Sequence, residues 1–67
     1  MTVTYYKCEP EGYLYKLDRD RLYTWWIERN EWYQYRTGST IYQMNMRAIK
    51  DKEYTTVSES DIMLELI

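Results

Sequence analysis

Residues 22–35 read LYTWWIERNEWYQY, which is two aromatic runs joined by the polar pair Arg29–Asn30. Aromatic and β-branched residues favour strands, and Asn tolerates the left-handed backbone of a tight turn. The stretch therefore predicts a hairpin in which one strand, Leu22–Glu28, turns back at Arg29–Asn30 into a second strand, Glu31–Arg36. A hairpin alone is marginally stable in water, so further strands or a helix must cover one of its faces.

The sequence on the N-terminal side of this hairpin continues the aromatic pattern. Thr2–Lys7 and Tyr13–Leu17 read as strands, and the segment Glu9–Gly12, which contains Pro10, separates them as a breaker. Asp18–Arg21 is a polar connection of the length expected for a hairpin. Together with residues 22–35, these segments predict a meander of about four antiparallel strands.

The segment Thr40–Ile49 fits both a helix and a strand. Thr40 and Gln43 have the spacing of a capping box, and apolar residues recur near helical spacing. From Tyr42 to Ala48 the same residues also alternate between apolar and polar, as a strand would. We favour a short helix, because Gln, Met, Arg and Ala are better helix formers than strand formers.

The C-terminal segment combines a short extended stretch, Glu53–Val57, with a helix. Ser58 is suited to cap that helix, and Asp61 falls in its first turn, where a negative charge favours the helix dipole. We expect the helix to run from about Glu59 to Leu66. Its apolar stripe should dock on the sheet. The stripe consists of Ile62, Met63 and Leu66.

Length and composition bound the architecture. With 67 residues the chain forms a single domain, residues 1–67. We expect an α+β fold: a small antiparallel β-meander of about four strands, with room for five or six, a C-terminal helix, and a short helix around residues 40–49. One cysteine, Cys8, and no histidine exclude an intramolecular disulfide and a usual zinc site. Aromatic packing or self-association must therefore stabilise so small a chain.

The chain carries no recognisable catalytic constellation. Without histidine, the Ser–His and Cys–His pairs that activate a nucleophile are absent. Gly12 and Gly38 alone cannot form a phosphate-binding loop. Paired carboxylates occur only in predicted turns, where acids are common for solvation, so a hydrolase built on them ranks last. We predict no enzyme, no catalytic residue, no metal ligand and no cofactor.

The sequence also indicates where the protein resides. Residues 1–8 lack the basic start and apolar core of a signal peptide, and the longest apolar run, Leu22–Ile27, is far too short for a membrane span. A lone thiol suits a reducing compartment. We expect a cytoplasmic protein with no membrane partner.

The aromatic inventory favours binding. The chain has nine Tyr, three Trp and no Phe, so every aromatic ring carries a polar atom that needs a partner when buried. Because successive strand residues point to opposite faces, the adjacent residues Trp25 and Trp26 cannot both enter one core. Both faces of the sheet therefore need covering, and two short helices can shield one face well and the other only partly.

We therefore predict a non-catalytic interaction module that binds a protein partner or another copy of itself through an aromatic face centred on Trp26 and Trp32. Alternatively, a Tyr or Trp ring and an arginine hold a nucleotide, or the tyrosines simply line a polar-edged core. Binding of nucleic acid is disfavoured, because the basic residues are interleaved with acidic ones and the net charge is −2. The candidate binding residues are Trp26, Trp32, Arg29, Arg36, Tyr33 and Tyr35.

A family resemblance is carried by Tyr13–Leu17, Trp25–Trp26, Trp32 and the segment Tyr54–Asp61, which reads YTTVSESD. In these segments the chain resembles small uncharacterised proteins of Gram-positive bacteria and their prophages, which combine aromatic strands with a closing Ser-Glu-type helix. The resemblance implies a cytosolic accessory protein, with a phage-borne protein that acts on a host or defence protein as one form of it. It carries over no functional residue.

Overall fold

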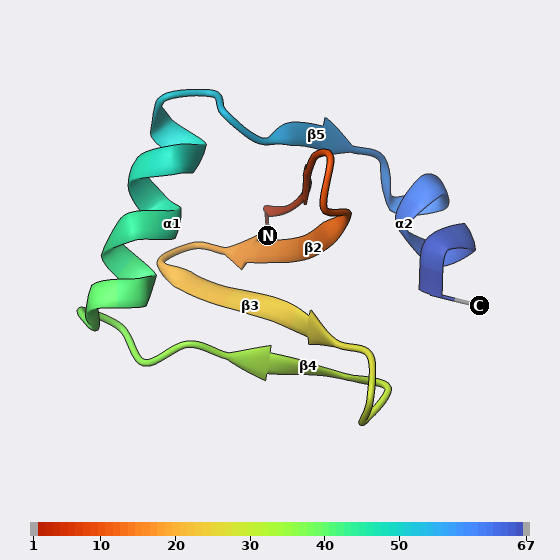
Figure 1. The fold of residues 1–67 in the computed structure, drawn as a ribbon, viewed down its shortest axis with the longest axis horizontal. Helices are drawn as coiled ribbons and strands as arrows, with labels where there is room; N and C mark the ends of the chain where they lie inside the picture. Colours follow the sequence, from red (N-terminus) through yellow and green to blue (C-terminus); the bar gives the residue numbers. More distant parts are fainter. Residues whose placement is uncertain (1, 67) are drawn as a thin grey trace.

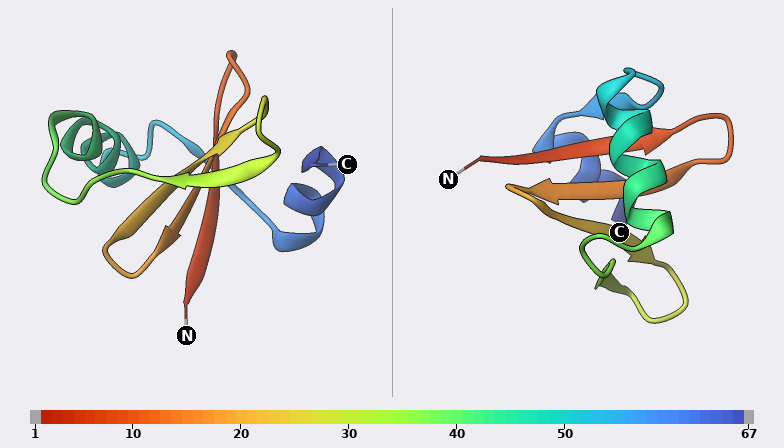
Figure 2. Two further views of the ribbon diagram at one scale, coloured as in Figure 1. Left: turned by 90° about the horizontal axis from the view of Figure 1, so that it is seen from below. Right: turned by 90° about the vertical axis from the view of Figure 1, so that its left-hand side faces the viewer.

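The computed structural model describes residues 2–66, which form a five-stranded antiparallel sheet with a helix on each side (Figures 1 and 2). The strand order is β4-β3-β2-β1-β5, so the predicted four-strand meander is confirmed and the last strand pairs with the first. The elements are β1 Val3–Cys8, β2 Tyr13–Asp18, β3 Arg21–Trp26, β4 Glu31–Gln34, α1 Thr40–Lys50, β5 Thr55–Val57 and α2 Glu59–Leu66.

The β2–β3 turn is tighter than the predicted connection. Asp18 pairs with Arg21, so both belong to strands and only Arg19–Asp20 forms the loop. Arg19 has a φ of 60°. A two-residue hairpin loop of the favoured kind needs such positive φ values, because its twist then matches that of the strands.

The β3–β4 turn is longer than the predicted pair Arg29–Asn30. Trp26 pairs with Glu31, so strand β3 ends at Trp26 and Ile27–Asn30 forms the loop. Asn30 takes the left-handed conformation, with a φ of 56°, as its side chain permits. The strand predicted to run to Glu28 is therefore wrong over its last two residues.

Helix α1 settles the ambiguity over residues 40–49 in favour of the predicted helix, but its cap lies one residue earlier than predicted. The backbone N–H of Tyr42 donates to Oγ of Ser39 at 3.3 Å, and Nε2 of Gln43 donates to the carbonyl oxygen of Gly38 at 2.9 Å. Ser39 has the extended backbone of an N-cap, whereas Thr40 is already helical. The capping-box assignment to Thr40 was therefore wrong.

The C-terminal helix agrees closely with its prediction. The backbone N–H of Asp61 donates to Oγ of Ser58 at 3.2 Å, which confirms the cap, and α2 ends at Leu66. Ile62 is 1% exposed and Leu66 is half-buried. Met63 is 58% exposed, so its predicted place in the docking stripe was wrong.

The two faces of the sheet follow from the strand register. One face, here called the α2 face, carries Lys7, Leu14, Trp25 and Trp32, and it is covered by α2 through Ile62 and an ion pair between Lys7 and Glu65. The opposite face, here called the α1 face, carries Tyr15, Leu22, Thr24, Trp26 and Tyr33. The left view of Figure 2 shows α1 and α2 on opposite sides of the sheet.

The apolar core is small and divided between the two faces. Among residues 2–66, the buried hydrophobic side chains are Leu14 and Ile62 on the α2 face, and Tyr15 and Leu22 on the α1 face. Few side chains are thus buried on either face of the sheet, as expected for so short a chain.

Candidate functional site

An aromatic groove lies on the α1 face, between strands β2–β4 and the first turn of α1. Its volume is about 540 Å³, within the range of small-molecule and side-chain binding clefts. We call this feature the aromatic groove. Its side chains include Tyr13, Tyr15, Trp26, Tyr33, Tyr35 and Ile41.

Three rings of the aromatic groove form an ordered row. The ring centroids of Trp26 and Tyr33 are 5.6 Å apart with planes at 90°, and those of Tyr33 and Tyr35 are 5.9 Å apart at 83°. This edge-to-face geometry is the one that aromatic quadrupoles prefer. The rings therefore hold one another in place, so these side chains lose little further conformational freedom when a ligand binds them.

Much of this ring surface remains exposed to solvent. Tyr33 is 47% exposed, Trp26 is 37% exposed, and Ile41 on the opposite wall is 50% exposed. The guanidinium carbon of Arg29 lies 4.7 Å from the Trp26 ring centroid, so a cation–π contact covers part of that ring. The groove is thus apolar and open, with one basic residue, Arg29, at its rim.

Tyrosine hydroxyls form hydrogen bonds between α1 and other parts of the chain. The hydroxyl of Tyr42 donates to the carbonyl oxygen of Asp20 in the β2–β3 turn at 2.7 Å. The hydroxyl of Tyr54 donates to Oδ1 of Asn45 at 2.7 Å, and Nδ2 of Asn45 donates to the carbonyl oxygen of Ile41 at 2.8 Å. Two of these bonds connect α1 to the β2–β3 turn and to Tyr54, and the third lies within the helix.

Tyr15, which lines the aromatic groove, is stacked on Tyr54. The rings of Tyr15 and Tyr54 are 5.0 Å apart and almost parallel, at 4°. Burial, followed by the neighbouring phenol of Tyr54, raises the pKa of Tyr15, and burial also raises the pKa of Tyr54. Both phenols are therefore neutral at physiological pH, and Tyr54 keeps the proton that it donates to Asn45.

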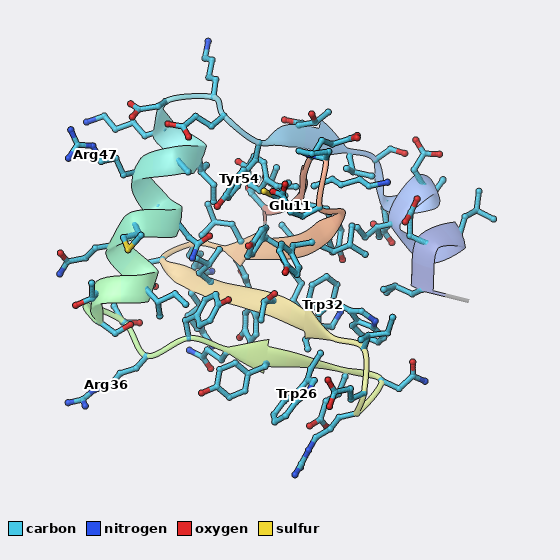
Figure 3. All side chains as sticks on the ribbon, in the orientation of Figure 1. Glu11, Trp26, Trp32, Arg36, Arg47 and Tyr54 are labelled. Carbon is cyan, nitrogen blue, oxygen red and sulfur yellow. The ribbon has the colours of Figure 1, made fainter. Side chains whose placement is uncertain are left out.

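The structure brings together four of the six predicted binding residues. Trp26, Tyr33 and Tyr35 line the aromatic groove, and Arg29 lies on the Trp26 ring. Arg36 is exposed after the end of β4, and in Figure 3 its side chain points away from the sheet and from Trp26.

Trp32 lies on the α2 face, so it does not share a surface with Trp26. Trp32 pairs with Trp25 on the neighbouring strand β3, with ring centroids 5.3 Å apart. Nζ of Lys16 lies 4.9 Å from the Trp32 ring centroid. The tyrosine ring of Tyr5 is a third neighbour, at 6.0 Å. Trp32 is half-buried in this cluster and acts in packing, because register places it opposite Trp25.

Five residues that line the groove were not among the predicted binding residues: Tyr13, Tyr15, Thr24, Trp25 and Ile41. Tyr13 lies two residues before Tyr15 on β2, so alternation along the strand could have placed it on the same face. Ile41 could not be found, because its position depends on how the first turn of α1 lies over β2–β4. That arrangement rests on the tyrosine bonds described above.

The other reactive groups offer little chemistry. Sγ of Cys8 donates to Oε1 of Glu11 at 3.5 Å, and burial, followed by this acid, raises the pKa of the thiol, which lowers its thiolate content. Across residues 2–66 there is no cluster of three His, Cys, Asp or Glu side chains that could hold a metal ion. No helix in this range is long and apolar enough to cross a bilayer.

Comparison of the chain with protein-family models, with curated proteins and with solved structures finds no match. The case for a function therefore depends on the geometry of the aromatic groove.

Proposed function

We propose that this chain is a non-catalytic protein-interaction module whose docking surface is the aromatic groove. The observation that carries the proposal is the row Trp26–Tyr33–Tyr35, whose rings are ordered by one another yet partly exposed beside an open cleft. Tyr, Trp and Arg are the residue types enriched where protein interfaces concentrate their binding energy. Rigid aromatic side chains also supply contact area at low entropic cost.

The partner suited to this groove is a protein segment with apolar side chains and few charges. The groove walls are aromatic or aliphatic, and Arg29 is engaged with Trp26 at the rim. The tyrosine hydroxyls can exchange hydrogen bonds with a partner backbone. We propose a cytoplasmic location for this binding, in keeping with the unpaired thiol of Cys8. The resemblance to prophage proteins adds a host or defence protein as the kind of partner to look for.

The test is capture of a partner from the native host, followed by titration with that partner in purified form. Tyr33→Ala and Trp26→Ala should each weaken binding by roughly thirtyfold, the effect of losing an interface hot spot. Met63→Ala is the matched control, because Met63 is exposed and apolar but lies on α2. Its affinity should equal that of the wild type.

Two results would overturn the proposal. Equal affinity of the Tyr33→Ala, Trp26→Ala and wild-type proteins would remove the groove from the interface. A rise in melting temperature with a nucleotide, lost in Arg29→Ala or Arg36→Ala, would instead support the nucleotide hypothesis, in which a Tyr or Trp ring and an arginine hold the nucleotide between them.

A further inference from the structure

The outer edge of β4 presents unpaired backbone groups. The N–H of Tyr35 donates to the carbonyl oxygen of Leu22 at 2.9 Å, in register with the β3–β4 ladder. In an antiparallel pair, alternate residues direct both backbone groups toward the same neighbour. Residues 31, 33 and 35 therefore bond to β3, and Trp32 and Gln34 direct their N–H and C=O groups outward.

This edge strand is short and carries one charge, Glu31, but it lacks the other usual protections. β4 reads EWYQ, with no Pro, no Lys and no interruption of its register with β3. It is the outermost strand, and Figure 1 shows no other element of residues 2–66 beyond it. The other outer strand, β5, has three residues and is followed closely by α2. Of the two edges, β4 is the more open to a further strand.

We propose that two copies of this chain pair antiparallel through β4, about a two-fold axis at Tyr33. In this register Trp32 of each copy bonds with Gln34 of the other, so all the outward backbone groups of the strand meet. It is also the register in which the whole stretch 31–35 finds a partner. A β4 edge is self-complementary in this way because the same alternate residues face outward in both copies.

The side chains agree with this register. Tyr33 meets Tyr33 of the second copy in a non-hydrogen-bonded pair, where side chains approach most closely. Glu31 lies opposite Tyr35 of the second copy at each end of the strip, on the same face as Tyr33. The outward direction of Arg36 and the position of Trp26 beside the free edge in Figure 3 suit such a neighbour.

The dimer is expected to be reversible. A strip of one short strand from each copy is smaller than the roughly 1,600 Å² of a standard stable interface, even with the tyrosine pair added. The second copy also covers ring surface that this small core leaves open, which is a usual route to stability for short chains. The inference depends on backbone groups and not on the cleft, although the second copy and a groove partner both contact Tyr33.

Sedimentation velocity over a range of protein concentrations tests this pairing. The mass should rise from the 8.4 kDa of the monomer toward the dimer as concentration increases. Gln34→Pro should remain a monomer at every concentration, because it removes an outward N–H and no bond to β3. Gln34→Ala is the matched control: it keeps the N–H and should dimerise like the wild type.

Hydrogen exchange provides a readout that needs no variant. The amides of Trp32 and Gln34 should exchange more slowly as concentration rises, whereas those of Tyr33 and Tyr35 are already bonded to β3 and should not change. A wild-type protein that stays monomeric, or a Gln34→Pro protein that dimerises normally, would overturn the inference. Loss of the dimer with unchanged binding of a groove partner would leave the proposed function standing.

Discussion

The two faces of the sheet are covered by helices of similar length in different ways. On the α2 face, Ile62 is 1% exposed and the helix is joined to β1 by the Lys7–Glu65 ion pair at 3.2 Å. On the α1 face, the helix is held by the hydroxyls of Tyr42 and Tyr54, and its apolar residues Ile41 and Met44 remain exposed. The cleft beside α2, which Leu14, Trp25 and Glu65 help to line, has a volume of about 360 Å³, whereas the aromatic groove on the α1 face has about 540 Å³.

The difference teaches how a small protein can keep aromatic surface available. An apolar side chain gains free energy only by removing area from water, so it draws its helix onto the sheet. A hydroxyl donor at the tip of a tyrosine holds its partner a full ring away from the backbone. The α1 face is therefore tethered by hydroxyls as well as packed at Tyr15 and Leu22, and its groove stays open between them and Ile41.

The largest effect is expected from Ile62, the buried residue of α2. Ile62→Ala should lower the free energy of unfolding by about 2–5 kcal/mol, because it removes buried methyl groups and leaves a cavity. Such a loss is a large part of the total stability of a small domain. Urea unfolding measures it. Met63→Ala, at an exposed position of the same helix, should change stability by less than about 0.5 kcal/mol. Equal effects of the two substitutions would contradict the burial of Ile62 under α2.

The next effect concerns the tether of α1. Tyr54→Phe keeps the ring that stacks on Tyr15 but leaves Oδ1 of the buried Asn45 without its donor. We expect a cost of about 1–3 kcal/mol, the penalty of a buried acceptor left unsatisfied. Amide exchange in α1 should accelerate while exchange in α2 stays the same. Faster exchange in α2, or no change in α1, would show that the hydroxyl is not the tether.

Alkaline pH should weaken the tethered face selectively. Folding raises the pKa of Tyr15 and Tyr54 above their ordinary value of 10.0, so the unfolded chain loses these protons first. The stabilisation is complete below about pH 10 and is lost as pH rises through the folded-state pKa values. Melting temperatures recorded up to alkaline pH should fall above about pH 10. Tyr15→Phe should make that fall shallower, and an unchanged slope would contradict the assignment.

The smallest effect is expected at the rim of the aromatic groove. Arg29→Ala removes an exposed cation–π contact, which is worth about 0.5–1 kcal/mol, and should make Trp26 easier to quench with a soluble fluorescence quencher. Arg36→Ala is the matched control, since Arg36 points away from the rings. Equal quenching in both variants would mean that Arg29 does not cover Trp26 in solution.

Much of the fold follows from local patterns in the sequence. Alternation correctly separated Trp25 from Trp26, and the cap at Ser58 correctly began α2. The turns were less well predicted, because Arg19 and Asn30 both adopt positive φ and the cross-strand pairs that close on them decide the loop length. Such pairing depends on the neighbouring strand and leaves little local signal.

The candidate site was predicted only in part, because it depends on register between strands. The sequence separates the two faces of each strand but does not say which face of β4 matches which face of β3. Trp32 was therefore grouped with Trp26, although the register places it with Trp25 on the α2 face. Ile41 escaped notice for a similar reason, since the tether from Tyr54 to Asn45 joins residues whose proximity to the groove is tertiary.

The contrast between the two faces is tested most directly by solvent paramagnetic relaxation measured on side-chain protons of the intact protein. A soluble paramagnetic agent at low protein concentration should relax the protons of Tyr33 and Ile41 strongly and those of Ile62 and Leu22 hardly at all. Relaxation of Tyr33 and Ile41 as weak as that of Ile62 would mean that α1 closes over the rings, and it would contradict the open groove.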